Sequence, residues 1–283
     1  MFPGAIAAEA PNRPAVIMAS TGQEITFKEL DEAANRLSQV LRTAGLNPGD
    51  HVAFCIENHP RYFEILWGCH YAGLIYTACS SRLTTDELNY IINDCGAKAF
   101  ITSKHKADQA AEVASTTPNV SLRLMLDGKI DGYDSYEDTV SKAPATELAN
   151  RVDGVDMLYS SGTTGRPKGI KLGLAMTTLG TPTSLSGLCS MLFAIDKDAI
   201  YLSPAPLYHA APLRFTMTTH RLGGTAIIME HFDAEEYLKL IAKHKVTHSQ
   251  LVPTMFVRML KLDEKVRRQF DTSSLKCAIH AAA

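Results

Sequence analysis

The sequence predicts an α/β fold with largely parallel sheets. Short apolar runs of strand length alternate with stretches whose apolar residues recur at helical spacing, and this rhythm continues along most of the 283 residues. The composition, 46% hydrophobic and 20% charged, is that of an ordinary soluble globular protein. The length exceeds that of a usual compact domain, so either one large unit or two smaller units are expected.

In the first half of the chain, start and stop signals delimit the expected elements. Thr26 to Glu29 form a capping box, and apolar residues follow at helical spacing until Gly45. A similar sequence, Thr84 to Glu87, opens a helix that ends before a glycine. We expect helices over 26–44, 61–72 and 84–95, and strands over 51–56, 75–78, 98–102, 122–126 and 155–160.

The second half repeats this rhythm. We expect strands over 200–202, 225–229, 246–252 and 275–279, and helices over 233–244 and 254–262. Between residues 127 and 153 the sequence is polar and rich in turn residues. We interpret this stretch as a surface excursion that connects elements.

Charge and cysteine content narrow the class of partner and the compartment. The net charge of −2 and the pI near 6.5 indicate neither nucleic acid nor an anionic membrane surface as a partner. The six cysteines contain no C-x-x-C pair, so we expect buried free thiols in a reducing compartment. No secretory signal is visible at the N-terminus, and the longest apolar patch, residues 185–195, is too short to span a bilayer. We expect a cytoplasmic protein without a transmembrane segment and leave a peripheral association with a membrane open.

One stretch, YSSGTTGRPKGIK at residues 159–171, has the features of a phosphate-binding loop. It follows an expected strand, its small residues let backbone N–H groups approach phosphate oxygens, and Lys168 supplies a positive charge. A Walker A loop has glycine before the lysine and Ser or Thr after it, whereas this chain has Pro167 and Gly169. The sequence therefore argues against a P-loop NTPase. It also lacks the G-x-G-x-x-G of a dinucleotide-binding fold.

The pattern from Ser160 to Gly169 resembles, at every position, the signature loop of the adenylate-forming superfamily. This superfamily includes acyl-CoA synthetases, firefly luciferase and the adenylation domains of peptide synthetases. Further segments resemble the family in the family's order: PLYHAAPL at 206–213, LVPTMFVRML at 251–260 and SLKCAIHAAA at 274–283. The resemblance covers essentially the whole chain and implies the first part of the large N-terminal domain of acyl-CoA synthetases. It would contain two packed α/β subdomains, one over about 50–175 and one over about 1–49 plus 176–283.

The resemblance also implies an activity and a set of site residues. In this family ATP and a carboxylate give an acyl-adenylate and pyrophosphate, and a thiol, usually that of CoA, then takes the acyl group. Ser161 is the residue whose hydroxyl would meet Mg²⁺, while Ala281 and Ala282 belong to the segment that packs on adenine. Lys168 and His209 are the expected catalytic residues. The family places His209 between the nucleotide and the acyl pocket, and the alternative for His209 is a buried core histidine. The residues implied for the phosphates are Ser160, Ser161, Gly162, Thr163, Thr164, Gly165 and Lys168.

The sequence departs from the family pattern in two respects. After Gly169 many relatives continue with a hydrophobic residue and Ser/Thr-His-Arg/Lys-Asn, whereas this chain continues Ile-Lys-Leu-Gly-Leu-Ala. Family members are also longer. We therefore expect the acidic residue that completes the Mg²⁺ site, the aspartate that holds the ribose and the small C-terminal domain to be absent from these residues. On this reading the 283-residue chain alone is inactive.

We expect the parent activity to be that of an ATP-dependent acyl-CoA synthetase for a fatty acid or another hydrophobic carboxylic acid. The segment 213–224 contains the apolar residues Leu213, Phe215, Met217 and Leu222 and the pair Gly223-Gly224, with Arg214 and Arg221 between them, and no charged residue is placed to bind an amino group. One alternative is an adenylating enzyme with another acceptor or acid class, such as a carrier protein or an aryl or amino acid. Another is a catalytically incompetent module that binds a nucleotide or acyl group. The expected partners are the acid, ATP and CoA, and a homodimer is left open.

Overall fold

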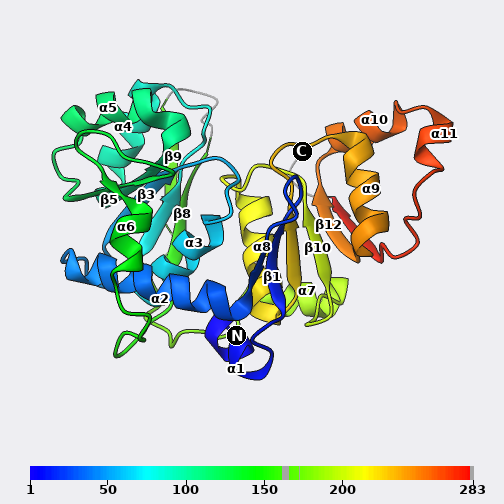
Figure 1. Ribbon diagram of the computed structural model, residues 1–283, viewed down its shortest axis with the longest axis horizontal. Helices are drawn as coiled ribbons and strands as arrows, with labels where there is room; N and C mark the ends of the chain where they lie inside the picture. Colours follow the sequence, from blue (N-terminus) through cyan, green and yellow to red (C-terminus); the bar gives the residue numbers. More distant parts are fainter. Residues whose placement is uncertain (161–165, 172, 281–283) are drawn as a thin grey trace. The chain divides into compact units, whose positions relative to one another are not determined.

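The computed structural model describes residues 1–160, 166–171 and 173–280 (Figure 1). The chain divides into two compact units. Unit 1 comprises Met1–Leu30 and Pro182–Ala283, and unit 2 comprises Asp31–Thr181. Each unit contains its own mainly parallel sheet, so the α/β class and the largely parallel sheets that the sequence predicts are confirmed.

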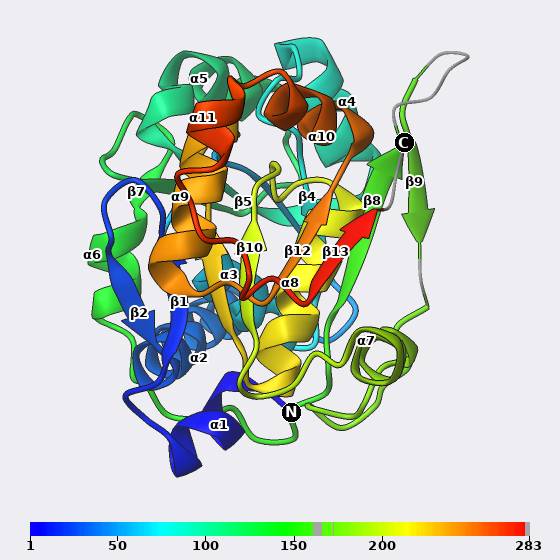
Figure 2. The same ribbon diagram turned by 90° about the vertical axis from the view of Figure 1, so that its right-hand side faces the viewer.

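The sheet of unit 1 has the strand order β13-β12-β10-β11-β1-β2 within the described residues. Strand β2 runs antiparallel to β1, and the other pairs are parallel. Figure 2 shows β10, β12 and β13 side by side. The strands are β1 (Pro14–Met18), β2 (Glu24–Thr26), β10 (Ile200–Ser203), β11 (Thr225–Ile228), β12 (His248–Leu251) and β13 (Cys277–His280). The helices are α1 (Pro3–Glu9), α7 (Ser184–Phe193), α8 (Ala210–Leu222), α9 (Ala234–His244), α10 (Pro253–Leu260) and α11 (Glu264–Arg267).

Helices cover both faces of this sheet. On one face, Leu202 and Ile227 pack against residues of α9 such as Leu240. On the other face, Tyr201 packs with Phe215 of α8 and residues of α7. Successive strand residues therefore face opposite layers, as the two-residue period of a strand requires. Because both faces are covered at the centre of this sheet, β10 and β11 are mainly apolar, whereas the buried β12 also contains His248, Ser249 and Gln250.

The sheet of unit 2 has the strand order β7-β6-β5-β3-β4-β8-β9 within the described residues. All its pairs are parallel except that of β8 with β9. The strands are β3 (His51–Cys55), β4 (Ile75–Ala78), β5 (Ala97–Ser103), β6 (Leu122–Leu126), β7 (Asp134–Ser135), β8 (Val155–Ser160) and β9 (Lys168–Lys171). The helical segments are α3 (Tyr62–Tyr71), α4 (Thr85–Asp94), η1 (Lys104–Lys106), α5 (Ala107–Thr116) and α6 (Tyr136–Ser141). Helix α2 (Phe27–Thr43) begins in unit 1 and continues in unit 2.

Two layers of side chains enclose the sheet of unit 2. Apolar residues of α4 and α5, among them Ile91 and Val113, form one core cluster with Ala53 and Phe100. On α3, Tyr62 stacks edge-on against Phe54 of β3, with ring centroids 5.3 Å apart. The parallel strands of this sheet all end at the same edge, which is where ligands bind in open α/β sheets.

Each strand and helix predicted from an apolar run is present, with its ends shifted by a few residues at most. The expectation of a surface excursion over 127–153 is wrong for part of that stretch. Tyr133, Tyr136 and Val140 are buried, and the Tyr136 hydroxyl donates a hydrogen bond to Glu64 Oε1 at 2.7 Å. The polar composition of the stretch therefore gave no indication that these three side chains, in α6 and just before it, are buried.

The boundary between the units differs from the expected one. The resemblance to the family implied boundaries near residues 49 and 175, whereas the contacts place them at Leu30/Asp31, within α2, and at Thr181/Pro182. From Asp31 onward α2 packs on α3: the Tyr71 hydroxyl donates to Asp31 Oδ1 at 2.5 Å, and a Cβ on Gly68 would lie 2.7 Å from Leu37 Cδ2. These contacts assign most of α2 to unit 2.

No helix among the described residues is long and apolar enough to cross a membrane. All six cysteines are free thiols; five are buried, as expected, and Cys277 is partly exposed. Burial raises the pKa of the Cys95 thiol to about 11 and that of Cys55 to about 12. These two thiols are therefore protonated and unreactive near neutral pH.

Candidate functional site

The glycine- and hydroxyl-rich stretch joins the two strands of an antiparallel hairpin. Strand β8 ends at Ser160 and β9 begins at Lys168, and the ladder pairs these two residues directly. Both side chains are exposed. In a Walker A loop the lysine lies at the start of a helix, whereas Lys168 starts a strand, which gives a structural reason for the predicted exclusion of a P-loop NTPase.

Gly169 lets the two strands of this hairpin pack closely. A Cβ at Gly169 would lie 2.9 Å from Cζ of Tyr159, its partner in the ladder, and 2.4 Å from Met157 Cε. The Tyr159 ring therefore occupies the space that a side chain at residue 169 would need. A larger residue there would push apart the two strands that carry Ser160 and Lys168.

In unit 1, His209 follows the carboxyl end of β10, a central strand of its sheet. Its carbonyl accepts a hydrogen bond from the Leu213 N–H at 3.1 Å, and it is the N-cap residue of α8. The imidazole lies against the Tyr208 ring with centroids 4.4 Å apart. The side chain is exposed, so the alternative of a buried core histidine is wrong.

Several predicted site residues lie outside the described part of the chain. They are Ser161, Gly162, Thr163, Thr164, Gly165, Ala281 and Ala282. The structure thus brings Ser160 and Lys168 together in unit 2 and places His209 in unit 1. The phosphate, Mg²⁺ and adenine roles of the other residues stay predictions.

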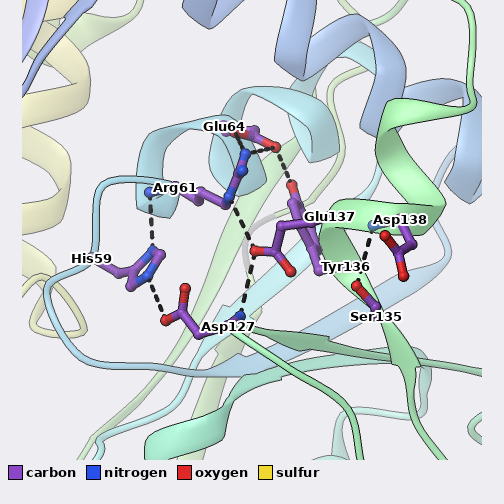
Figure 3. Close-up of polar contacts among 8 residues, drawn as sticks. All are labelled: His59, Arg61, Glu64, Asp127, Ser135, Tyr136, Glu137 and Asp138. Carbon is purple, nitrogen blue, oxygen red and sulfur yellow. Dashed lines mark hydrogen bonds and ion pairs between the residues drawn. The ribbon is translucent and has the colours of Figure 1, made fainter.

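A second polar cluster lies at the carboxyl ends of β3 and β6, and Figure 3 shows two of its members, His59 and Asp127. Each of Glu57, His59 and Asp127 offers a ligand atom, and these atoms lie within 4.8 Å of one another. The Arg61 backbone N–H donates to His59 Nδ1 at 3.1 Å, so Nε2 carries the ring proton and donates to Asp127 Oδ2 at 3.0 Å. A metal on Nε2 would require a proton on Nδ1, facing the Arg61 N–H. We therefore interpret the cluster as a hydrogen-bond network and assign no metal to it.

Arg61 extends this network into the interior (Figure 3). Its guanidinium contacts Glu64 at 3.1 Å and Glu137 at 3.2 Å, and Glu64 also accepts from the buried Tyr136 hydroxyl. Burial raises the pKa of Glu64, while Arg61 and Tyr136 oppose that shift. The network thus ties the start of α3 to α6 and stabilises the edge of the sheet.

Comparison with protein families decides what kind of protein carries this hairpin. A family model described as AMP-binding enzyme matches residues 5–283, almost the whole chain. The chain belongs to the AMP-binding enzymes. The predicted membership of the adenylate-forming superfamily is therefore confirmed.

Individual members of the family are similar over most of the chain. A feruloyl-CoA synthase from Amycolatopsis sp is 36% identical over 239 residues, which cover 83% of this chain and 45% of the relative. The long-chain-fatty-acid–CoA ligase FadD13 from Mycobacterium tuberculosis is 28% identical over 258 residues, 90% of this chain and 49% of the relative. Among solved structures, the inhibitor-bound N-terminal domain of FACL13 from M. tuberculosis superposes with a TM-score of 0.86 at 25% identity, covering 99% of this chain and 69% of that one. The chain spans about half the length of these two curated relatives.

Sequence reasoning missed the residues around the hairpin that contact it from another element. The Tyr159 hydroxyl donates to Asp94 Oδ2 at 2.5 Å, and the Arg166 guanidinium lies 5.1 Å from the centroid of the Tyr90 ring. Asp94 and Tyr90 belong to α4, far from the motif in sequence. Only the polar and aromatic character of the last turn of α4 could have drawn attention to them.

Proposed function

We propose that this chain binds ATP at the Ser160–Lys168 hairpin and belongs to an enzyme that converts a hydrophobic carboxylic acid into its acyl-CoA thioester. The observation that carries the proposal is the direct pairing of Ser160 with Lys168 at the end of β8, a strand parallel to β4. A hydroxyl donor and a positive charge are thereby held side by side at the carboxyl edge of a parallel sheet. Membership of the AMP-binding enzymes supports a nucleotide at this edge.

The chemistry requires stabilisation of negative charge. A carboxylate oxygen attacks the α-phosphorus of ATP, a new O–P bond forms, and the bond to the leaving pyrophosphate breaks. Lys168 would neutralise part of the charge that develops on the pyrophosphate, and Ser160 would donate a hydrogen bond to it. The CoA thiol would then attack the acyl carbonyl and release AMP. In the family arrangement His209 would border the acyl group, and its exposure at the carboxyl end of β10 is consistent with this role.

Two classes of acid are candidate substrates. Fatty acids were the first expectation, yet the feruloyl-CoA synthase is 36% identical and the fatty-acid ligase FadD13 is 28% identical. The higher identity to the feruloyl-CoA synthase makes an aromatic acid with an unsaturated side chain a second candidate substrate beside a fatty acid. CoA is the proposed acceptor, and a carrier protein is the alternative. Ser161 lies outside the described residues, so Mg²⁺ at that position stays a prediction.

Substitution of Lys168 tests the nucleotide site. We expect the chain to bind MgATP and Lys168→Ala to weaken binding about tenfold, because one charged contact to a phosphate is worth about 1.4 kcal/mol. Isothermal titration calorimetry measures both affinities. Lys142→Ala, which removes an equal charge from the C-cap of α6 in the same unit, should bind MgATP like the parent. Equal affinities for the parent and Lys168→Ala would exclude the phosphate role of this lysine.

A panel of acids tests the reaction. Ferulate, coumarate and fatty acids of different length are supplied with ATP and CoA to the 283-residue chain and to the protein that contains it. We expect acid-dependent AMP and acyl-CoA from the containing protein. MgATP binding without any acid-dependent AMP or pyrophosphate would instead favour the incompetent binding module.

A further inference from the structure

Helix α4 contacts both arms of the β8–β9 hairpin. On the outgoing arm, the Tyr159 hydroxyl donates to Asp94 Oδ2 at 2.5 Å. On the returning arm, the guanidinium of Arg166 lies over the Tyr90 ring, 5.1 Å from its centroid. Tyr90 and Asp94 are four residues apart in the helix and therefore lie on one face of it. One helix face thus contacts the hairpin before Ser160 and again before Lys168.

Tyr159 links this helix face to both strands. Its hydroxyl reaches Asp94, while its ring fills the space next to the Cα of Gly169, the residue that follows Lys168. A single rigid side chain therefore spans from α4 to the first residues of β9. Because Ser160 is the next residue after Tyr159, the same contact also constrains the end of β8.

The place of Asp94 needs an explanation, because a carboxylate in the last turn of a helix faces the negative end of the helix dipole. The hydrogen bond from Tyr159 explains this position, because a charged acceptor such as the Asp94 carboxylate strengthens the bond. Burial, with the bond to Asp94, raises the pKa of Tyr159, and desolvation and Asp94 raise that of Tyr90. Both phenols therefore keep their protons near neutral pH, and Tyr159 stays a donor.

We propose that Asp94 and Tyr90 are positioning residues for the nucleotide: through Tyr159 and Arg166 they hold Ser160 and Lys168 at the separation that the phosphates require. This inference rests on the proposed function of the hairpin. Neither α4 residue touches the phosphates. Their effect is on nucleotide affinity, through the pre-organisation of the residues that do.

The first arm of the test uses the Tyr159–Asp94 bond. Tyr159→Phe and Asp94→Ala are each expected to weaken MgATP binding about three- to tenfold, the range of one typical lost hydrogen bond. The double variant should bind no more weakly than the worse single variant, because both remove the same contact. Asp94→Asn keeps an oxygen acceptor and should restore most of the affinity. Urea midpoints of all four variants measure stability separately.

The second arm uses the Arg166–Tyr90 contact. Tyr90→Leu removes the aromatic face and should weaken MgATP binding about two- to fourfold, as expected for an exposed cation–π contact. Tyr90→Phe keeps the face beneath the guanidinium and should lose less affinity than Tyr90→Leu. Both variants leave the charge of Arg166 in place, so a direct effect of that charge on ATP cannot produce the difference.

The outcomes separate this inference from the proposed function. If the parent binds no MgATP, the proposed function fails and the inference with it. If the parent binds and Lys168→Ala weakens binding as expected, while Tyr159→Phe and Asp94→Ala bind like the parent, only the inference is overturned. Additive losses in the double variant, or lower urea midpoints with unchanged affinity, would likewise reduce these contacts to a structural role.

Discussion

Gly154→Ala is expected to lower the free energy of unfolding by about 3 kcal/mol or more, since it overpacks a buried site. Gly154 is buried immediately before β8. A Cβ at this position would lie 2.6 Å from Leu74 O, 2.8 Å from Cys69 O and 2.9 Å from His70 Cα. All three are backbone atoms, so no change of side-chain rotamer can relieve the overlap.

The backbone around Gly154 also cannot shift freely, because it holds the junction between α3, β4 and β8. The Val155 N–H donates to Leu74 O at 3.1 Å, and the Leu74 N–H donates to Cys69 O at 2.9 Å. The Gly154 N–H itself donates to His70 O at 3.2 Å. Moving either overlapping oxygen away from a new methyl group would weaken a bond of this junction, so relaxation has its own cost.

Urea denaturation followed by the fluorescence of Trp67 measures the effect. Trp67 is the single tryptophan of the chain and is fully buried in α3 of the same unit. The matched control is Gly173→Ala, because a Cβ at Gly173 meets nothing within 4 Å. The control should stay within about 0.5 kcal/mol of the parent. A Gly154→Ala variant as stable as the control would contradict the prediction.

The elements that could be predicted are those whose signal is local. A strand buried on both faces is a short apolar run, and a helix with one apolar stripe shows its period and its caps. Strands β6 and β8 match their predicted ranges for this reason, and α4 carries the expected capping box at Thr84. Strand β9 was missed because Lys168–Lys171 contains two lysines and a glycine and so has no apolar run. It forms by antiparallel pairing with the edge of β8.

Helix α8 shows a second reason why patterns fail. Polar side chains such as Thr216 and Thr219 are buried in it, so no apolar stripe marks the helix. Each of these hydroxyls donates to a carbonyl one turn earlier: Thr216 Oγ1 to Pro212 O at 2.7 Å and Thr219 Oγ1 to Phe215 O at 3.0 Å. Because the helix satisfies these polar groups itself, burial does not require apolar residues here.

The residues of the candidate site also differ in whether a local sequence signal marks them. Ser160 and Lys168 could be named from the sequence because one contiguous motif contains both. Asp94 could not, because it lies 65 residues from Tyr159 and meets it only through the folding of the sheet. A polar residue at the end of a helix, such as Asp94, does not indicate in the sequence which residue the tertiary structure places beside it.

Acidification is expected to destabilise unit 1 through His220 of α8. The fully buried imidazole donates from Nε2 to Ala15 O of β1 at 3.0 Å, and its ring packs edge-on against Phe27 with centroids 6.0 Å apart. Burial lowers the pKa of His220 from 6.5 to about 4, and the hydrogen bond to Ala15 opposes this shift only in part. A proton on the ring would place an unsolvated charge in the core.

The direction of the pH dependence follows from the two pKa values. In the folded state the imidazole stays neutral down to about pH 4, whereas in the unfolded state it is protonated below about pH 6.5. The unfolded state therefore binds more protons within this window, and the free energy of unfolding falls as the pH falls. Between about pH 7.5 and pH 5.0 this one group should remove about 2 kcal/mol.

Urea titrations of the parent and of His220→Gln at these two pH values, followed by far-ultraviolet circular dichroism, measure this contribution. Glutamine has a side-chain N–H but no group that titrates in the window, so the parent should lose about 2 kcal/mol more than the variant on acidification. Thr225→Val is the matched control: it removes a comparable hydrogen bond to β1, from Thr225 Oγ1 to Pro14 O at 2.7 Å, without removing a titratable group. It should lower the free energy of unfolding equally at both pH values, which separates proton linkage from the loss of a contact. If His220→Gln loses stability with falling pH as steeply as the parent, the protons are taken up elsewhere and the assignment to His220 is wrong.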